Sequence, residues 1–148
     1  MAYYSGSVSD IKVVLRTLNI GSGTLDNLDE IAVAESQAKV DAEIDSTLSN
    51  LYYTPLSLIT RNSVSKYPDP IPYMARRLVA ADLIINSLVD VNANVVQTAQ
   101  NVATSERQTL FEMGAGNVGS QRLAGQVCKS RNHFQPSGIV PSIPPVQR

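Results

Sequence analysis

The apolar residues between positions 74 and 89 recur at the spacing of an α-helix, and this pattern constrains the fold more than any other part of the chain. Successive members are four and three residues apart, which places them on one face of a helix. Pro72 would lie in the first turn, where a missing N–H group is harmless. The segment therefore predicts a core helix. Its apolar face consists of Met74, Leu78, Ala81, Ile85 and Leu88, widened by Val79, Leu83, Ile84 and Val89.

Two helices are expected before this core helix. Ser7 offers an N-cap for a short helix that carries Ile11, Leu15 and other apolar residues and stops at residues 19–23. A longer helix is predicted over about residues 27–52. Its apolar face is expected to consist of Leu28, Ile31, Ala34, Ala38, Ala42, Ile44, Leu48 and Leu51.

Charged residues on the longer helix suggest how its other side is used. Glu35 and Lys39, and Lys39 and Glu43, are four residues apart and are expected to pair on the exposed side. Asp41 and Asp45 also share a face. Without histidines or further carboxylates nearby, they are expected to be solvated and not to bind a metal ion.

The remaining segments complete a mainly α fold, a small bundle of four to five helices. Pro68, Pro70 and Pro72 exclude a continuous helix or central strand from residues 52–72, and a short β element is expected at 56–60. An amide-rich helix with a thin apolar face is predicted over 95–113, and a further short helix over 120–130. Residues 1–132 would form the helical domain, and the proline-rich residues 133–148 an extended C-terminal tail.

The charges of the chain are unevenly distributed. All 13 acidic residues lie at or before Glu112, together with 8 of the 12 basic ones, so this part carries a net charge of −5. The last 36 residues carry Arg122, Lys129, Arg131 and Arg148 and no acid. Such a basic arm is suited to an acidic neighbour, to another copy of the chain or to nucleic acid, or it serves as a solubilising tail. No apolar run approaches the length of a membrane span.

The segment Gly114-Ala115-Gly116-Asn117-Val118-Gly119 fits the G-x-G-x-x-G template of dinucleotide-binding proteins, but its surroundings do not. That template follows a buried strand and precedes an acidic residue by about 20 positions. Here the preceding residues are polar and helical in character, and no acid follows. We therefore interpret Gly114 and Gly116 as helix-cap glycines, one of which ends the preceding helix in the left-handed conformation.

Signatures of enzymes and of bound cofactors or metals are not apparent in the sequence. His133 is the single histidine and has no carboxylate after it, which argues against a catalytic triad. Cys128 is the single cysteine and is expected to be a small buried apolar residue. The sequence predicts neither an enzyme nor a cofactor.

A series of landmarks follows in order along residues 8–123: Ile44-Asp45, Leu48, Tyr52, Pro55-Leu56, Ala80-Ala81-Asp82-Leu83, Arg107, Leu110, Gly114 or Gly116, and Leu123. They correspond to a short helix before a longer one, a proline-rich connection, a helix with an Ala-Ala-Asp-Leu core and a last helix with a Leu…Gly…Leu pattern. This order resembles the head–tail adaptor (connector, or head-completion) proteins of tailed bacteriophages.

The resemblance implies a structural virion protein that is made in the host cytoplasm and joins the head to the tail. Family members form an oligomeric ring, typically of twelve copies, between the portal protein and the stopper or tail proteins, and viral DNA passes through its lumen. By analogy, the C-terminal tail would bind the portal or a neighbouring subunit. The expected docking residues are Phe134, Ile139, Val140, Ile143 and Val146, with electrostatic attraction from Arg122, Lys129 and Arg131. The alternative is a small cytosolic helical DNA-binding or regulatory protein that uses its basic C-terminal arm.

Overall fold

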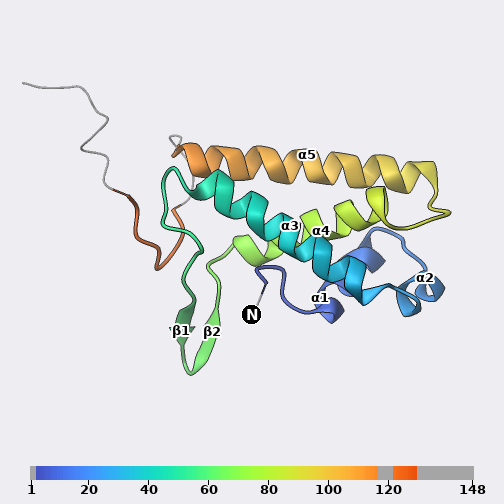
Figure 1. Ribbon diagram of the computed structural model, residues 1–148, viewed down its shortest axis with the longest axis horizontal. Coiled ribbons are helices and arrows are strands. Elements are labelled where there is room, and N and C mark those ends of the chain that lie inside the picture. The colour runs from blue at the N-terminus through green and yellow to red at the C-terminus, as the bar shows by residue number, and fades with distance from the viewer. Residues whose placement is uncertain (1–2, 117–121, 130–148) are drawn as a thin grey trace, which may run out of the picture.

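The computed structural model describes residues 3–116 and 122–129. Within these residues the fold is mainly helical, with one small antiparallel sheet, as the sequence predicts (Figure 1). The tail predicted at residues 133–148 lies outside the described residues. The elements in chain order are α1 (Val8–Thr17), α2 (Ser22–Asp26), α3 (Glu30–Leu48), β1 (Ile59–Arg61), β2 (Val64–Lys66), α4 (Ile71–Asn86) and α5 (Ala93–Ala115).

Helix α4 is the centre of the core, as its apolar pattern predicts. It packs against α5, α3 and α1, and in Figure 1 it crosses behind α3 and below α5. Its buried residues are Ile71, Met74, Ala75, Leu78, Val79, Ala80, Ala81, Leu83 and Ile84. The predicted apolar face extends too far, however. The helix ends at Asn86, and Asp90 turns the chain at a φ of 56°, so Leu88 and Val89 lie in the following loop and not on the helix.

The start of the chain folds around two short helices. Ser7 caps α1 as predicted: its side chain accepts from the backbone N–H of Asp10, and the Asp10 carboxylate accepts from the backbone N–H of Ser7 at 2.9 Å. The break predicted at residues 19–23 is shorter in the structure, because α2 begins within it at Ser22 and buries Leu25. Helix propensity does not predict this short helix, because two of residues 21–26 are glycines.

Helix α3 is shorter than predicted, and its buried face is different. The buried residues are Val33, Ser36, Gln37, Val40, Ile44 and Leu48, whereas Ala38 and Ala42 are exposed and Ile31 is 73% exposed. Two polar side chains are buried because each has a partner. The Ser36 hydroxyl lies 2.7 Å from the Asp82 carboxylate, and the Gln37 amide donates to Ser5 and Gly6.

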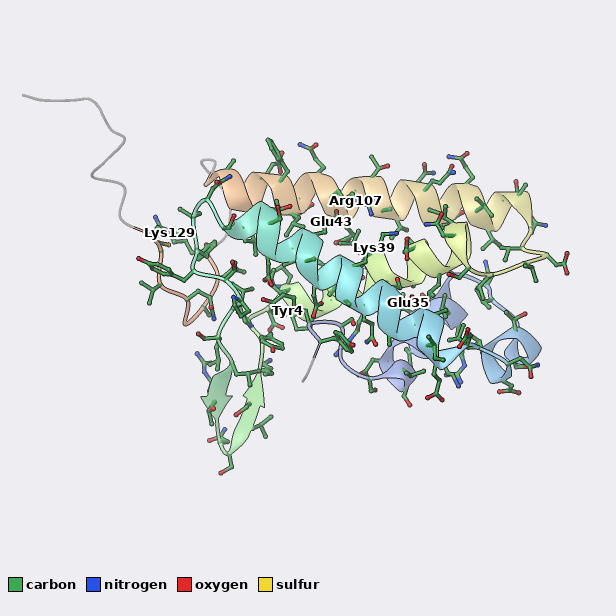
Figure 2. The ribbon with its side chains drawn as sticks, in the orientation of Figure 1. Tyr4, Glu35, Lys39, Glu43, Arg107 and Lys129 are labelled. Carbon is green, nitrogen blue, oxygen red and sulfur yellow. The ribbon has the colours of Figure 1, made fainter. Side chains whose placement is uncertain are left out.

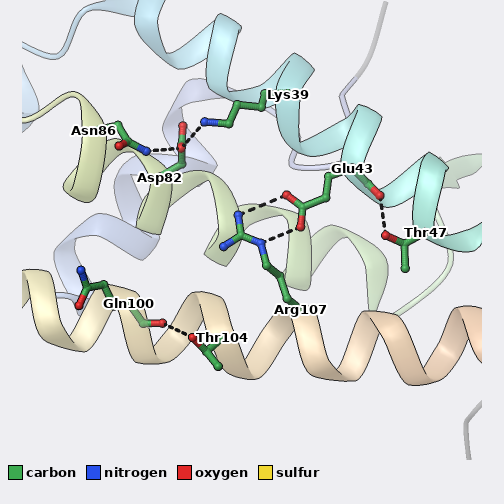
Figure 3. A network of polar contacts seen from close by, with 8 residues as sticks. All are labelled: Lys39, Glu43, Thr47, Asp82, Asn86, Gln100, Thr104 and Arg107. Carbon is green, nitrogen blue, oxygen red and sulfur yellow. Dashed lines mark hydrogen bonds and ion pairs between the residues drawn. The ribbon is translucent and has the colours of Figure 1, made fainter.

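The ion pairs expected within α3 form between helices instead. Lys39 binds Asp82 of α4 at 2.8 Å, and Glu43 binds Arg107 of α5 through two hydrogen bonds of 2.7 and 3.2 Å (Figure 3). Both α3 residues therefore pair with neighbouring helices, although the Lys39 side chain stays 60% exposed. A paired guanidinium and carboxylate with two bonds also fixes how α5 is placed relative to α3.

Tyr4 fixes the N-terminal segment against α3, and this changes the interpretation of Asp41 and Asp45. The buried Tyr4 hydroxyl donates to Asp45 at 2.5 Å and accepts from the backbone N–H of Leu56 at 2.8 Å. The backbone N–H of Tyr4 lies 3.3 Å from the Asp41 carboxylate oxygens. Figure 2 shows Tyr4 beside α3. The expectation that both aspartates are solvated is wrong, because both are half-buried structural acceptors.

This environment predicts a fall in stability between pH 4 and pH 6. Burial raises the pKa of Asp41 to about 6, the Tyr4 N–H lowers it, and the charge of Asp45 raises it. The folded state therefore holds this proton more tightly than the unfolded state, so stability decreases as pH rises through this range. We expect Asp41→Asn to abolish that slope and to raise the free energy of unfolding at pH 7.5 by about 1–2 kcal/mol, since solvent screens part of the charge. Urea denaturation at several pH values measures both effects, and an unchanged slope would contradict the assignment.

The short β element is confirmed in part, and its partner strand was missed. Only Ile59 and Thr60 of the predicted 56–60 segment are in β1, which pairs with β2 so that Ile59 faces Lys66 and Arg61 faces Val64. Asn62 and Ser63 join the strands, with φ values of 51° and 64°. Positive φ at both central residues is the conformation of the tight turns that match the twist of a hairpin.

The C-terminal part of the described chain contains one confirmed helix and one wrong prediction. Helix α5 extends the predicted 95–113 segment by two residues at each end. The helix predicted at 120–130 is not formed over residues 122–129, which run as a turn and an extended segment beside residues 49–57. The segment is extended because Cys128 pairs with Tyr52 in an isolated antiparallel β-bridge. The backbone N–H of Lys129 also donates to the Leu51 carbonyl at 2.8 Å. Among the described residues, no helix is long and apolar enough to cross a membrane.

Candidate interaction surface

The β1–β2 hairpin projects from the helical body and has two unlike faces (Figure 1). Directly opposed residues of an antiparallel pair point to the same side, and neighbours along a strand alternate. Thr60 and Ser65 therefore share one face, where their hydroxyls are 2.7 Å apart. The other face combines apolar and basic side chains, namely Ile59, Arg61, Val64 and Lys66.

The apolar and basic face of the hairpin forms one wall of a groove. Pro68, Asp69, Arg122 and Ala124 complete the lining, and the groove has a volume of about 400 Å³. We call these eight residues the hairpin groove. It contains three basic residues and one acid, Asp69, which pairs with Lys66 at 3.5 Å. Its net charge is therefore positive, although the chain as a whole has a charge of −1.

Gly125 brings the C-terminal segment against the hairpin. Its φ is 70°, and a Cβ atom at this position would lie 2.9 Å from Cγ1 of Ile59. Glycine therefore permits both the left-handed turn and the close approach. The side chain of Gln126 continues the contact, since its amide exchanges hydrogen bonds with the backbone of Ser57 at 2.9 and 2.8 Å. The hairpin groove is thus held in shape from both sides.

The loop between α4 and α5, residues 87–92, lies at the other end of the body from the hairpin (Figure 1). Val89 at its tip is 79% exposed, more than any other large apolar side chain in the described part of the chain. Asp90 follows it at the turn. The hollows on either side of the loop are lined by Asp29 and Asp90, and neither Lys nor Arg is among the described residues that line them.

Two of the predicted docking residues are described, and both contact their own chain. The Lys129 ammonium donates to the Ser49 carbonyl at 2.5 Å and lies 5.6 Å from the ring centre of Tyr53. Arg122 is exposed in the hairpin groove, and its guanidinium lies 2.8 Å from Sγ of Cys128. Lys129 therefore holds the base of the C-terminal arm, whereas Arg122 presents its charge to solvent. The other predicted docking residues, Arg131, Phe134, Ile139, Val140, Ile143 and Val146, lie outside the described residues.

The two predicted helix-cap glycines have different roles. Gly116 is the C-cap of α5 in the left-handed conformation, with φ 66° and ψ 32°, which confirms it as a cap. Gly114 is buried inside the last turn of α5. A Cβ atom there would lie 2.3 Å from the Thr47 carbonyl oxygen of α3. Gly114 therefore permits close packing of two helices and is not a cap. Gly119 lies outside the described residues.

The described residues offer no group of three or more His, Cys, Asp or Glu side chains positioned to hold a metal ion. Cys128 is half-buried rather than fully buried as expected. His133 lies outside the described residues. Comparisons of the chain with family models, with curated proteins and with solved structures gave no match.

Sequence reasoning did not find the hairpin groove. The sequence pattern predicts no role for Arg61, Val64 and Lys66, because three prolines nearby indicate an irregular connection. The signal was present, however. The β-branched residues Ile59, Thr60 and Val64 flank Asn62-Ser63, and asparagine tolerates positive φ better than most residues. Arg122 was predicted as a docking residue, but only the structure places it beside the hairpin.

Proposed function

We propose that this chain is a head–tail adaptor of a tailed bacteriophage. It would be a structural virion protein that forms an oligomeric ring between the portal and the stopper or tail proteins. DNA would pass through the lumen without specific binding. The chain would act through its surfaces and not as an enzyme.

The observation that carries this proposal is the structural role of the landmark residues that resemble the adaptor family. Nine of them lie in the core, namely Ile44, Leu48, Tyr52, Leu56, Ala80, Ala81, Leu83, Leu110 and Leu123. The polar landmarks join the elements to one another. Asp45 accepts from Tyr4, Asp82 accepts from α3, and Arg107 binds Glu43. A resemblance at positions that determine the packing supports a shared fold.

Three surfaces of the body support assembly. The outer face of α5 is polar but has few charges: Gln97, Gln100, Asn101 and Gln108 are all exposed. Gln97 and Asn101, and Gln108 and Glu112, bond to each other along the helix, and the exposed Phe111 adds an apolar group near the end of this face. The hairpin groove and the α4–α5 loop present unlike charges at different ends of the body. Unlike ends favour head-to-tail association, which closes into a ring when the rotation between copies permits.

Co-purification with the portal protein tests the proposal and the role of the tail together. The full chain is expected to form a stable complex with the assembled portal, and a variant lacking residues 134–148 is expected to lose most of its affinity. The matched control replaces the five apolar residues of the tail with serine while it keeps the length and the charges. If the truncated and the full chain bind the portal equally, the docking role of the tail is wrong.

The alternative function, DNA binding through the basic arm, predicts a different result. A gel-shift assay with duplex DNA would then show binding that weakens steeply with salt. Under the adaptor proposal the chain does not shift DNA at physiological salt, because the body is acidic and a lumen that binds phosphates tightly would impede passage. A salt-sensitive shift by a monomer or dimer would therefore favour the alternative.

A further inference from the structure

We propose that the α4–α5 loop of one copy docks in the hairpin groove of the next copy, so that successive subunits contact head to tail. This inference rests on the proposed function, since it assigns the contact that would build the ring. The occupant is a second copy of this chain, and the contact joins two ends that are apart within one subunit.

Two features of the hairpin groove favour a partner that covers it. Its strands have three residues each, and an isolated two-stranded hairpin is marginal in water. Val64, which pairs with Arg61 next to the turn of the hairpin, is 63% exposed. Covering the apolar and basic face would bury Val64 and complete the burial of Ile59, which the body leaves half-exposed.

The α4–α5 loop has the shape and the apolar character to fill the groove. It protrudes at the end of the body away from the hairpin (Figure 1), and its tip residue Val89 is almost fully exposed. The positive φ of Asp90 makes a tight turn, which keeps the tip narrow. Val89 would then pack between Ile59 and Val64, one branched apolar side chain against two others.

The charges of the two surfaces are complementary. Arg61, Lys66 and Arg122 line the groove with a single acid, whereas Asp90 and the nearby Asp29 lie at the loop. Asp90 would approach the three basic groups as Val89 enters the groove. Two copies meeting through the same surface would instead place like charges together, which costs several kcal/mol. The complementarity therefore selects head-to-tail association over a symmetric dimer.

The opposite positions of the two surfaces explain why the contact forms between copies. The hairpin and the α4–α5 loop lie at different ends of the body in Figure 1, so one chain does not satisfy its own groove. The growing assembly therefore keeps one free groove at one end and one free loop at the other after every addition. Such a heterologous contact continues until the ring closes.

Disulfide trapping tests this contact directly. In a Cys128→Ser background, a chain with Val64→Cys and a chain with Val89→Cys are purified separately, mixed and oxidised, both as free protein and on the portal. We expect a covalent dimer in the mixture at several times the yield of either variant alone. A chain with both cysteines is expected to give a ladder of covalent oligomers. The matched control is Thr60→Cys in place of Val64→Cys, which puts the thiol on the opposite face of the same hairpin.

The outcomes separate this contact from the ring itself. Selective cross-linking of Val64→Cys with Val89→Cys, with little for Thr60→Cys, supports the contact. Rings in electron micrographs without selective cross-linking would overturn the contact and leave the adaptor function standing. Homodimers of Val64→Cys alone at the highest yield would show a symmetric interface and would also overturn it. Neither rings nor selective cross-links, with the portal present, would overturn both.

Discussion

Replacement of Gly114 by alanine is expected to destabilise the protein by about 3 kcal/mol and to lower its Tm by roughly 10 °C. Helix propensity alone predicts the opposite, because alanine is more favourable than glycine within a helix by about 1 kcal/mol. The packing around Gly114 decides whether the substitution stabilises or destabilises the protein. The new Cβ atom would lie 2.3 Å from the carbonyl oxygen of Thr47, and backbone cannot turn aside as a flexible side chain does. Helices α3 and α5 would have to separate.

Gly116 supplies the matched control two residues away. Gly116→Ala introduces strain from the left-handed backbone, at about 1 kcal/mol, and Gly116→Asn should cost less because asparagine tolerates that conformation. Chemical denaturation measures the free energy of unfolding of all three variants. We expect the m-value to be the same for each, so that a shift of the midpoint reports stability alone. A Gly114→Ala variant as stable as the original chain would show that the two helices do not meet at this glycine.

Replacement of Asp82 by alanine is expected to cost about 2–4 kcal/mol. Its carboxylate is only 9% exposed and accepts hydrogen bonds from Ser36, Lys39 and Asn86 at 2.7, 2.8 and 2.8 Å (Figure 3). Alanine would leave the buried Ser36 hydroxyl without this acceptor and Lys39 without its charge partner. The exposed Asp69 is the matched control, since its pairing with Lys66 should contribute less than about 1 kcal/mol.

The effect of Asp82 is also expected to depend on pH, with the opposite sign to that of Asp41. Burial would raise the pKa of Asp82, but the hydrogen bonds from Lys39, Ser36 and Asn86 outweigh it and hold the pKa below its ordinary value. The stability that Asp82 contributes is therefore present above about pH 4 and is lost as pH falls through the lowered pKa. The difference between the original chain and Asp82→Ala should shrink in acid. A constant difference down to pH 2.5 would contradict the network.

The sequence predicts the helices of this fold well and their buried faces less well. The spacing of apolar residues located α4 and α5 within a few residues, because both have one continuous apolar face. It misassigned α3, where alanines occur on both sides and the buried positions include Ser36 and Gln37. These residues are buried because partners from α4 and the N-terminal segment meet them. Such long-range partners are not visible in the local pattern of one helix.

The candidate surface was less predictable than the fold. The uneven charge distribution of the sequence predicts docking residues in the C-terminal arm. One of them, Arg122, does lie in the hairpin groove. Lys129, predicted for the same role, instead binds the Ser49 carbonyl. Arg61 and Lys66 contribute charge to the groove only because the turn at Asn62-Ser63 brings their strands together. The apolar pattern placed Val89 on a helix. In the structure α4 ends at Asn86, so Val89 lies at the tip of the following loop.

The GAGNVG segment illustrates how local patterns can mislead about function. Two of its glycines are described, and each has a structural reason to be glycine: Gly116 ends a helix and Gly114 lies against another. Both glycines lie at the C-terminal end of α5, whereas a nucleotide-binding loop opens a helix with its N-terminus towards the phosphates. The geometry therefore supports a packing role for these residues.

Native mass spectrometry of the full chain bound to its portal tests the central claim most directly. The account predicts one dominant complex in which the copies of this chain form a closed ring, typically of twelve, with ring-shaped density below the portal in electron micrographs. Mixed charge variants sharpen the result: Asp90→Lys alone should reduce ring formation, and Asp90→Lys combined with Arg61→Asp should restore part of it. A chain that stays monomeric or dimeric in the presence of the portal would contradict the account.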